Sequence, residues 1–161
     1  VLIVEELDKI LKAEPDREVI ILSDRRNHLQ EIEKCLRHKN YNNIGYYVGG
    51  MKQDDLKKTE KQNIILGTYN MVSEGFDLPK LNTLVLASPK SDVEQSVGRI
   101  QRQLKEDRLH TALVLDIVDQ FSIFTNQGNK RKAFYTKNGY SIKELDKLNN
   151  IVNLKKMAFS E

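Results

Sequence analysis

The sequence predicts an α/β protein with a doubly wound, mainly parallel sheet and helices on both faces. Four short runs of mostly branched apolar residues carry this prediction, at 19–22, 64–66, 84–87 and 112–115. Continuous apolar runs of this length are typical of strands buried on both faces, as in a parallel sheet. Amphipathic stretches separate the first runs, and alternating strands and helices are the pattern of doubly wound domains.

The elements of the N-terminal part follow from residue spacing. Val4, Leu7 and Leu11 share one helical face, which predicts a first helix. Apolar residues at the same spacing between 29 and 36 predict a second helix with a basic last turn, which suits the helix dipole. The expected elements are a helix ending before Pro15, a strand at 19–22, a helix over 29–39, a weaker strand at 44–48 closed by Gly49 and Gly50, and a strand at 64–66.

The rest of the chain is predicted less regularly. A helix over 92–105 is expected to follow Pro89 and to begin near Ser91 or Asp92 as its N-cap. Beyond Asp116, a helix over 120–138, a short segment at 140–142 and a helical or frayed end at 143–161 are expected. We therefore divide the chain into an N-terminal helix and lead-in (1–17), a core (18–120) and a C-terminal helical, basic extension of the same domain (121–161).

Length, charge and cysteine content set outer bounds on function. The chain has 161 residues, enough for one domain, and its net charge of +3 permits contact with nucleic acid without demanding it. A single cysteine, Cys35, cannot form an intrachain disulfide, and no apolar run is long enough to span a membrane. We expect a reducing, intracellular compartment. Because the chain starts with Val rather than Met, we also expect a piece of a longer protein.

Several catalytic patterns are absent from the sequence. It contains no Gly-x-x-x-x-Gly-Lys-Ser/Thr phosphate loop and no Asp-Glu pair to hold Mg²⁺. Its three histidines, at 28, 38 and 110, lack metal-ligand spacing, so no metal site is predicted. The sequence of this chain alone shows no complete catalytic constellation.

A first constellation lies on the predicted helix 92–105. Gln95, Arg99 and Arg102 are spaced i, i+4 and i+7, so they project from one helical face. Two guanidinium groups and an amide on one face can bind a polyphosphate. The alternative is a solvated charged face, because more charged residues follow directly.

A second constellation follows the strand at 64–66. Gly67 and Thr68 could offer a backbone N–H and a hydroxyl to a phosphate, while Glu74 and Asp77 flank Gly75 and suit sugar hydroxyls. The alternative is a connecting turn with a short helix. A third segment, 22–29, contains Ser23, Asp24 and two arginines; it is either a strand end with a helix cap or a contact to a nucleic-acid backbone.

Together these segments resemble motifs IV, V and VI of superfamily 2 helicases. Residues 21–29 resemble motif IV, residues 67–79 motif V, and residues 95–102 the Gln-x-x-Gly-Arg-x-x-Arg form of motif VI; residues 47–50 resemble an intermediate strand-and-turn motif. The resemblance covers 18–117 and implies a C-terminal RecA-like domain. A motif VI that begins with Gln is similar to that of DNA translocases and departs from the His-Arg-x-Gly-Arg form of DEAD-box RNA helicases. The Asn/Lys-rich composition is similar to that of a large cytoplasmic DNA virus.

The resemblance implies roles for matching residues. Arg99 and Arg102 would reach the γ-phosphate of ATP held by a second RecA-like domain, with Arg102 as the arginine finger and Gln95 ordering both. Gly75 and Asp77 would line the nucleotide, with Glu74 assisting. The predicted contacts to the phosphates of one nucleic-acid strand are Ser23, Asp24, Arg25, Gly49, Gly67 and Thr68.

The resemblance therefore implies the second motor domain of an ATP-dependent helicase or translocase. ATP with Mg²⁺ would be bound mainly by an N-terminal RecA-like domain of the same polypeptide, and the track would be DNA, with RNA as the alternative and a link to transcription. This chain alone would then be inactive, and a viral source would place it in the cytoplasm or virion. Two other interpretations stay open: a stand-alone nucleic-acid-binding α/β module without ATPase activity and, ranked last, a different α/β enzyme such as a nucleotide-sugar transferase.

Overall fold

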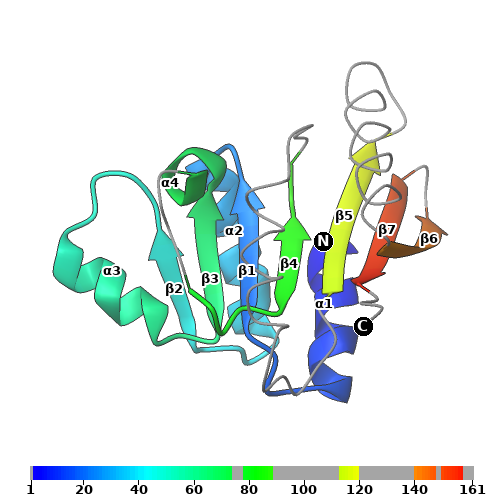
Figure 1. Ribbon diagram of the computed structural model, residues 1–161, viewed down its shortest axis with the longest axis horizontal. Coiled ribbons are helices and arrows are strands. Elements are labelled where there is room, and N and C mark those ends of the chain that lie inside the picture. Colours follow the sequence, from blue (N-terminus) through cyan, green and yellow to red (C-terminus); the bar gives the residue numbers. More distant parts are fainter. Residues whose placement is uncertain (1, 74–77, 89–112, 120–139, 148–149, 158–161) are drawn as a thin grey trace.

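A single mixed sheet organises the described residues. The computed structural model describes residues 2–73, 78–88, 113–119, 140–147 and 150–157. Its strands form one seven-stranded sheet in the order β2-β3-β1-β4-β5-β7-β6 (Figure 1). The elements are α1 (Leu2–Ala13), β1 (Val19–Ser23), α2 (Arg26–His38), β2 (Ile44–Tyr47), α3 (Gln53–Glu60), β3 (Ile64–Thr68), α4 (Tyr69–Ser73), β4 (Thr83–Leu86), β5 (Leu113–Asp119), β6 (Tyr140–Lys147) and β7 (Asn150–Met157).

The first five strands in chain order are parallel, as the sequence predicted. Val19 at the start of β1 pairs with Ile64 of β3 on one side and with Thr83 of β4 on the other. β2 pairs with β3 and β5 pairs with β4, also in parallel. All five residues of β1 are buried, which explains why this strand is a continuous apolar run rather than an alternating one.

Alternate residues of β1 face two separate cores, because side chains alternate across a strand. Ile20 and Leu22 belong to a core that includes residues of α4. Val19 and Ile21 belong to a second, larger core with the apolar faces of α1 and α2. Helices therefore cover both faces of the parallel sheet, which confirms the predicted fold class.

The C-terminal part of the sheet corrects the sequence prediction. We expected a helical or frayed end over 143–161, but the described residues there form β6 and β7. β7 pairs antiparallel with both β5 and β6, so backbone pairing along its length decides the conformation. The prediction rested on the polar composition and sparse apolar residues of this end, which do not reveal pairing with other strands.

The remaining comparisons with the sequence prediction concern helices. Helix α3 was not predicted, because only Leu56 and Thr59 are buried in an otherwise polar segment. The helices expected over 92–105 and 120–138 lie outside the described residues. Within the part that the structure describes, no helix is both long and apolar enough to cross a membrane.

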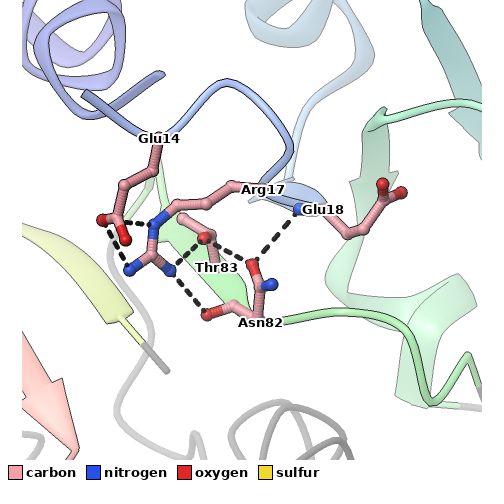
Figure 2. Close-up of polar contacts among 5 residues, drawn as sticks. All are labelled: Glu14, Arg17, Glu18, Asn82 and Thr83. Carbon is pink, nitrogen blue, oxygen red and sulfur yellow. Dashed lines mark hydrogen bonds and ion pairs between the residues drawn. The ribbon is translucent and has the colours of Figure 1, made fainter. Parts of the chain in front are cut away.

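A buried arginine joins the α1–β1 connection to the start of β4 (Figure 2). The Arg17 side chain is 3% exposed and donates hydrogen bonds to a Glu14 carboxylate oxygen from Nε (3.1 Å) and Nη2 (3.0 Å). Its Nη1 donates to Thr83 Oγ1 at 3.0 Å, and the Glu18 backbone N–H donates to Asn82 Oδ1 at 3.2 Å. These contacts fix the amino ends of β1 and β4 together.

We predict that Arg17→Ala lowers the free energy of unfolding by about 2–3 kcal/mol, because it removes hydrogen bonds from a buried charged group and leaves Thr83 without that donor. Urea unfolding followed by far-ultraviolet circular dichroism measures the change. Arg37→Ala is the matched control: Arg37 pairs with Glu33 at 2.7 Å on an exposed helix surface, so its loss should cost less than about 1 kcal/mol. Equal losses in both variants would contradict a special role for Arg17.

Candidate nucleic-acid interface

The carboxyl edge of the parallel sheet brings the predicted phosphate contacts together. Ser23, the last residue of β1, pairs in register with Thr68, the last residue of β3. Tyr47 at the end of β2 pairs with Gly67, so the Gly49–Gly50 turn that follows β2 lies at the same edge. Three segments far apart in sequence thus end side by side, where ligands of doubly wound sheets bind.

The loop after β1 is held by its own hydrogen bonds. Ser23 is fully buried, and its Oγ lies 3.0 Å from His28 Nδ1. The same oxygen accepts the Arg25 backbone N–H at 3.3 Å, and the Asp24 backbone N–H donates to Ser88 Oγ at 2.9 Å. The Ser23 hydroxyl therefore shapes the loop, while the side chains of Asp24 and Arg25 stay exposed.

Arg26 links this loop to the glycine turn. Its guanidinium Nη2 donates a hydrogen bond to the Gly49 carbonyl oxygen. Gly50 has a φ of +84°, a conformation that favours glycine, so the turn depends on this residue. Arg26 belongs to the 22–29 segment, whose two arginines were one predicted contact to a nucleic-acid backbone, but Arg26, His28 and Ser88 were not among the six residues predicted to touch the phosphates.

Positive charge gathers at this edge. The Arg25 side chain is 67% exposed and lies 3.8 Å from the Asp24 carboxylate, a loose contact between exposed groups. Arg26 and Lys52 are exposed as well. The pKa of His28 is lowered by its burial and, secondly, by the Arg25 guanidinium, both of which disfavour the protonated imidazole beside the Ser23 hydroxyl.

The predicted ATP-binding residues lie outside the described residues. These are the motif VI residues Gln95, Arg99 and Arg102 and the motif V residues Glu74, Gly75 and Asp77. In the described ranges, no group of three or more His, Cys, Asp or Glu side chains could hold a metal ion.

A cavity of about 150 Å³ lies at the opposite, amino edge of the sheet, away from the predicted contacts. Its lining includes Arg17, Tyr41 and Asn63. Asn63 directly precedes β3 and Thr68 is the last residue of β3, so these two residues lie at opposite ends of the strand. The cavity is therefore not part of the candidate interface.

Comparison with known protein families identifies the family of this chain. The model of the helicase conserved C-terminal domain matches residues 3–107, so the chain belongs to this family. Together with the fold, the match makes it a helicase C-terminal domain with the RecA-like architecture.

Two viral relatives agree with this assignment. The chain is 37% identical over 131 residues to a protein of Acanthamoeba polyphaga mimivirus, "Putative ATP-dependent RNA helicase L396", covering 80% of this chain and 25% of that protein. It is 33% identical over 100 residues to the similarly named QP509L of African swine fever virus, covering 62% of this chain and 19% of that protein. The chain thus spans a quarter or less of the length of these relatives. Their viral origin agrees with the resemblance of the Asn/Lys-rich composition to that of a large DNA virus.

Solved structures support the fold. The C-terminal domain of the DEAD-box protein Dbp5 matches with a TM-score of 0.64 at 14% identity, over 84% of this chain and 77% of that one. The C-terminal part of the Fun30 ATPase domain matches with a TM-score of 0.63, also at 14% identity, over 80% of this chain and 44% of that one. At these identities the likeness concerns the fold alone.

We predict that Gly67 and Gly49, both at this edge, differ in their tolerance of substitution. A Cβ at Gly67 would lie 3.1 Å from Val72 Cγ2 and 3.3 Å from the Tyr47 carbonyl oxygen, and this backbone atom cannot easily move. Gly67→Ala should therefore lower the free energy of unfolding by about 1–3 kcal/mol. A Cβ at Gly49 meets only Arg26 Nη2, at 3.5 Å, so Gly49→Ala should change stability by less than about 0.5 kcal/mol. Urea unfolding of both variants tests this; a smaller loss for Gly67→Ala than for Gly49→Ala would refute it.

We predict a pH dependence of stability that originates at His28. The folded state lowers the His28 pKa below its ordinary 6.5, so the unfolded chain binds a proton more readily. This contribution to stability is complete above pH 6.5 and is lost as the pH falls through the folded-state pKa. Unfolding of the wild type should therefore become easier as the pH is lowered from about 7.5 to 5.5.

Denaturant unfolding across this pH range, compared between wild type and His28→Gln, measures the effect. The variant should show a weaker pH dependence. His38→Gln changes an exposed histidine at the end of the same helix and should keep the wild-type dependence. Parallel pH profiles for wild type and His28→Gln would show that the dependence arises elsewhere.

Proposed function

We propose that this chain is the second motor domain of an ATP-dependent helicase or translocase. In this proposal its carboxyl edge forms part of the track for one nucleic-acid strand. The observation that carries the proposal is the meeting of Ser23, Thr68 and the Gly49–Gly50 turn at one edge beside exposed arginines. Contacts of this type position a strand through its phosphates and do not read its sequence.

The described contacts suggest a division of labour within the track. Thr68 is partly exposed and can offer its hydroxyl, and the Arg25 guanidinium extends into solvent. Ser23 and Gly67 are buried, so they act by shaping the loop and by close packing. Of the six predicted contacts, these two would thus serve the interface indirectly.

The proposed roles at ATP rest on the family motifs. In this proposal Arg102 is the arginine finger, Arg99 a second phosphate contact, and Gln95 orders them, while Glu74, Gly75 and Asp77 line the nucleotide. An N-terminal RecA-like domain of the same polypeptide would bind most of the ATP and its Mg²⁺. When bound there, ATP would supply the phosphoryl group that is transferred to water.

The nature of the track is part of the proposal. The Gln-first motif VI favours DNA, and a transcription-associated role is compatible with a viral source. The names of L396 and QP509L contain RNA instead. Phosphate contacts alone suit either strand, so the experiment below includes both.

We predict that Arg102→Ala in the full-length protein lowers ATP turnover by about 10³-fold, because a finger that stabilises transition-state charge contributes about 10³–10⁵ in rate. Binding of single-stranded nucleic acid should change by less than about threefold, since the residue lies outside the proposed track. Steady-state ATPase assays with no nucleic acid, with single-stranded DNA and with RNA of equal length measure turnover and identify the activating strand. Arg108→Ala, which changes an arginine outside the motif, should keep normal turnover.

The same assays on the isolated chain test the alternative of a stand-alone module. We expect it to bind nucleic acid and to hydrolyse no ATP. Clear ATP turnover by the isolated chain that Arg102→Ala abolishes would contradict the proposal. A full-length protein without ATPase activity but with intact nucleic-acid binding would favour the stand-alone module.

A further inference from the structure

Two hydrogen bonds, one buried and one partly buried, link segments at the carboxyl ends of the central strands. Ser88 lies two residues beyond the end of β4, is 5% exposed and accepts the Asp24 backbone N–H at its Oγ, at 2.9 Å. The Ser88 carbonyl oxygen accepts the hydroxyl of Tyr69 at 2.7 Å, and Tyr69 is 4% exposed. One residue thus holds the loop after β1 with its side chain and the first residue of α4 with its backbone.

The positions of these partners in the sequence relate the contacts to the proposed track. Asp24 precedes the exposed Arg25, and Tyr69 follows Thr68, so both are next to residues of the proposed track. Ser88 lies two residues beyond the end of β4, and the chain beyond it leads to the motif VI residues at 95–102. Asp24 and Tyr69 belong to the segments that resemble motifs IV and V, and Ser88, which contacts both, precedes the motif VI segment along the chain.

Burial distinguishes the two hydrogen bonds of Ser88. A tyrosine hydroxyl that is buried without a partner is costly, so the bond of Tyr69 is not easily exchanged for water, whereas the bond of the Asp24 N–H is partly buried. The Ala87 backbone N–H also donates to the Leu22 carbonyl oxygen at 2.8 Å, which ties the same two strand ends one residue earlier. These bonds tie the end of β1 and the loop after it to the residues that follow β4 at two successive positions.

We propose that Ser88 and Tyr69 are positioning residues that couple nucleic-acid binding at the loop after β1 to ATP hydrolysis. The proposal rests on the proposed function. Neither residue contacts nucleic acid or ATP in it; each acts by fixing the chain that leaves β4 relative to the loop and to Thr68. Removing either bond loosens this link and leaves the two binding surfaces themselves in place.

The test compares Tyr69→Phe and Ser88→Ala with wild type in the full-length protein. Tyr69→Phe keeps the ring in the core and removes only the hydroxyl, so it addresses coupling with the least change in packing. The matched control is Tyr41→Phe, which removes a hydroxyl that donates to Asp8 at 2.6 Å away from this network. Three quantities are measured: ATPase without nucleic acid, ATPase at saturating single-stranded nucleic acid, and the Kd for that strand.

Coupling predicts that the ratio of stimulated to unstimulated ATPase falls by about fivefold or more in Tyr69→Phe and Ser88→Ala. Unstimulated ATPase and Kd should change by less than about twofold, and Tyr41→Phe should keep the wild-type ratio. A wild-type ratio in Tyr69→Phe overturns the inference and leaves the proposed function standing. A loss of unstimulated ATPase in proportion, or a similar loss in Tyr41→Phe, also overturns it, because it reveals a general structural effect. A wild type without any stimulation overturns both proposals.

Discussion

The parallel pairing of β1 with both β3 and β4 is the constraint on which the rest of the structure depends. Because β1 lies between two strands that are distant in sequence, its in-register pairs place the ends of three segments at a common edge. The same burial requires apolar residues on both faces of β1, so two cores form from one strand. The pairing and burial of β1 therefore determine both the arrangement of the candidate site and the stability of the fold.

The two edges of the sheet are stabilised in different ways. At the amino edge, charged groups are neutralised within the fold: Arg17 by Glu14, and Lys80 by Glu18 at 3.0 Å. At the carboxyl edge, the buried partners are neutral hydroxyl, imidazole and backbone groups, and the arginines remain outside. The first arrangement ties the start of β1 to the start of β4, and the second leaves positive charge available to an anionic ligand.

Elements that a local residue pattern determines were predicted from the sequence, and elements or contacts that depend on distant parts of the chain were not. The runs at 19–22 and 64–66 lie in the observed β1 and β3, because an apolar run of this length has few other stable locations. Helix α3 was missed because Leu56 alone supplies its large apolar contact. Strand β7 was missed because its segment is polar with sparse apolar residues, while β5 and β6 determine its pairing. The Ser23–His28 and Asp24–Ser88 contacts could not be predicted, because nothing in the spacing states which hydroxyl faces which donor.

A motif at such an edge mixes two kinds of residue that a sequence pattern cannot separate. Ser23, Gly67 and Ser88 are buried, and their groups interact within the fold. The two serine hydroxyls accept hydrogen bonds from backbone N–H groups, and the absence of a side chain at Gly67 allows Val72 and the Tyr47 carbonyl oxygen to pack close to it. Arg25 and Thr68 retain accessible groups. The buried set determines where the accessible set stands, so substitutions in the two sets should fail differently, the first through stability or coupling and the second through affinity. Among residues of one motif, burial is therefore the observation that distinguishes a positioning role from a contact.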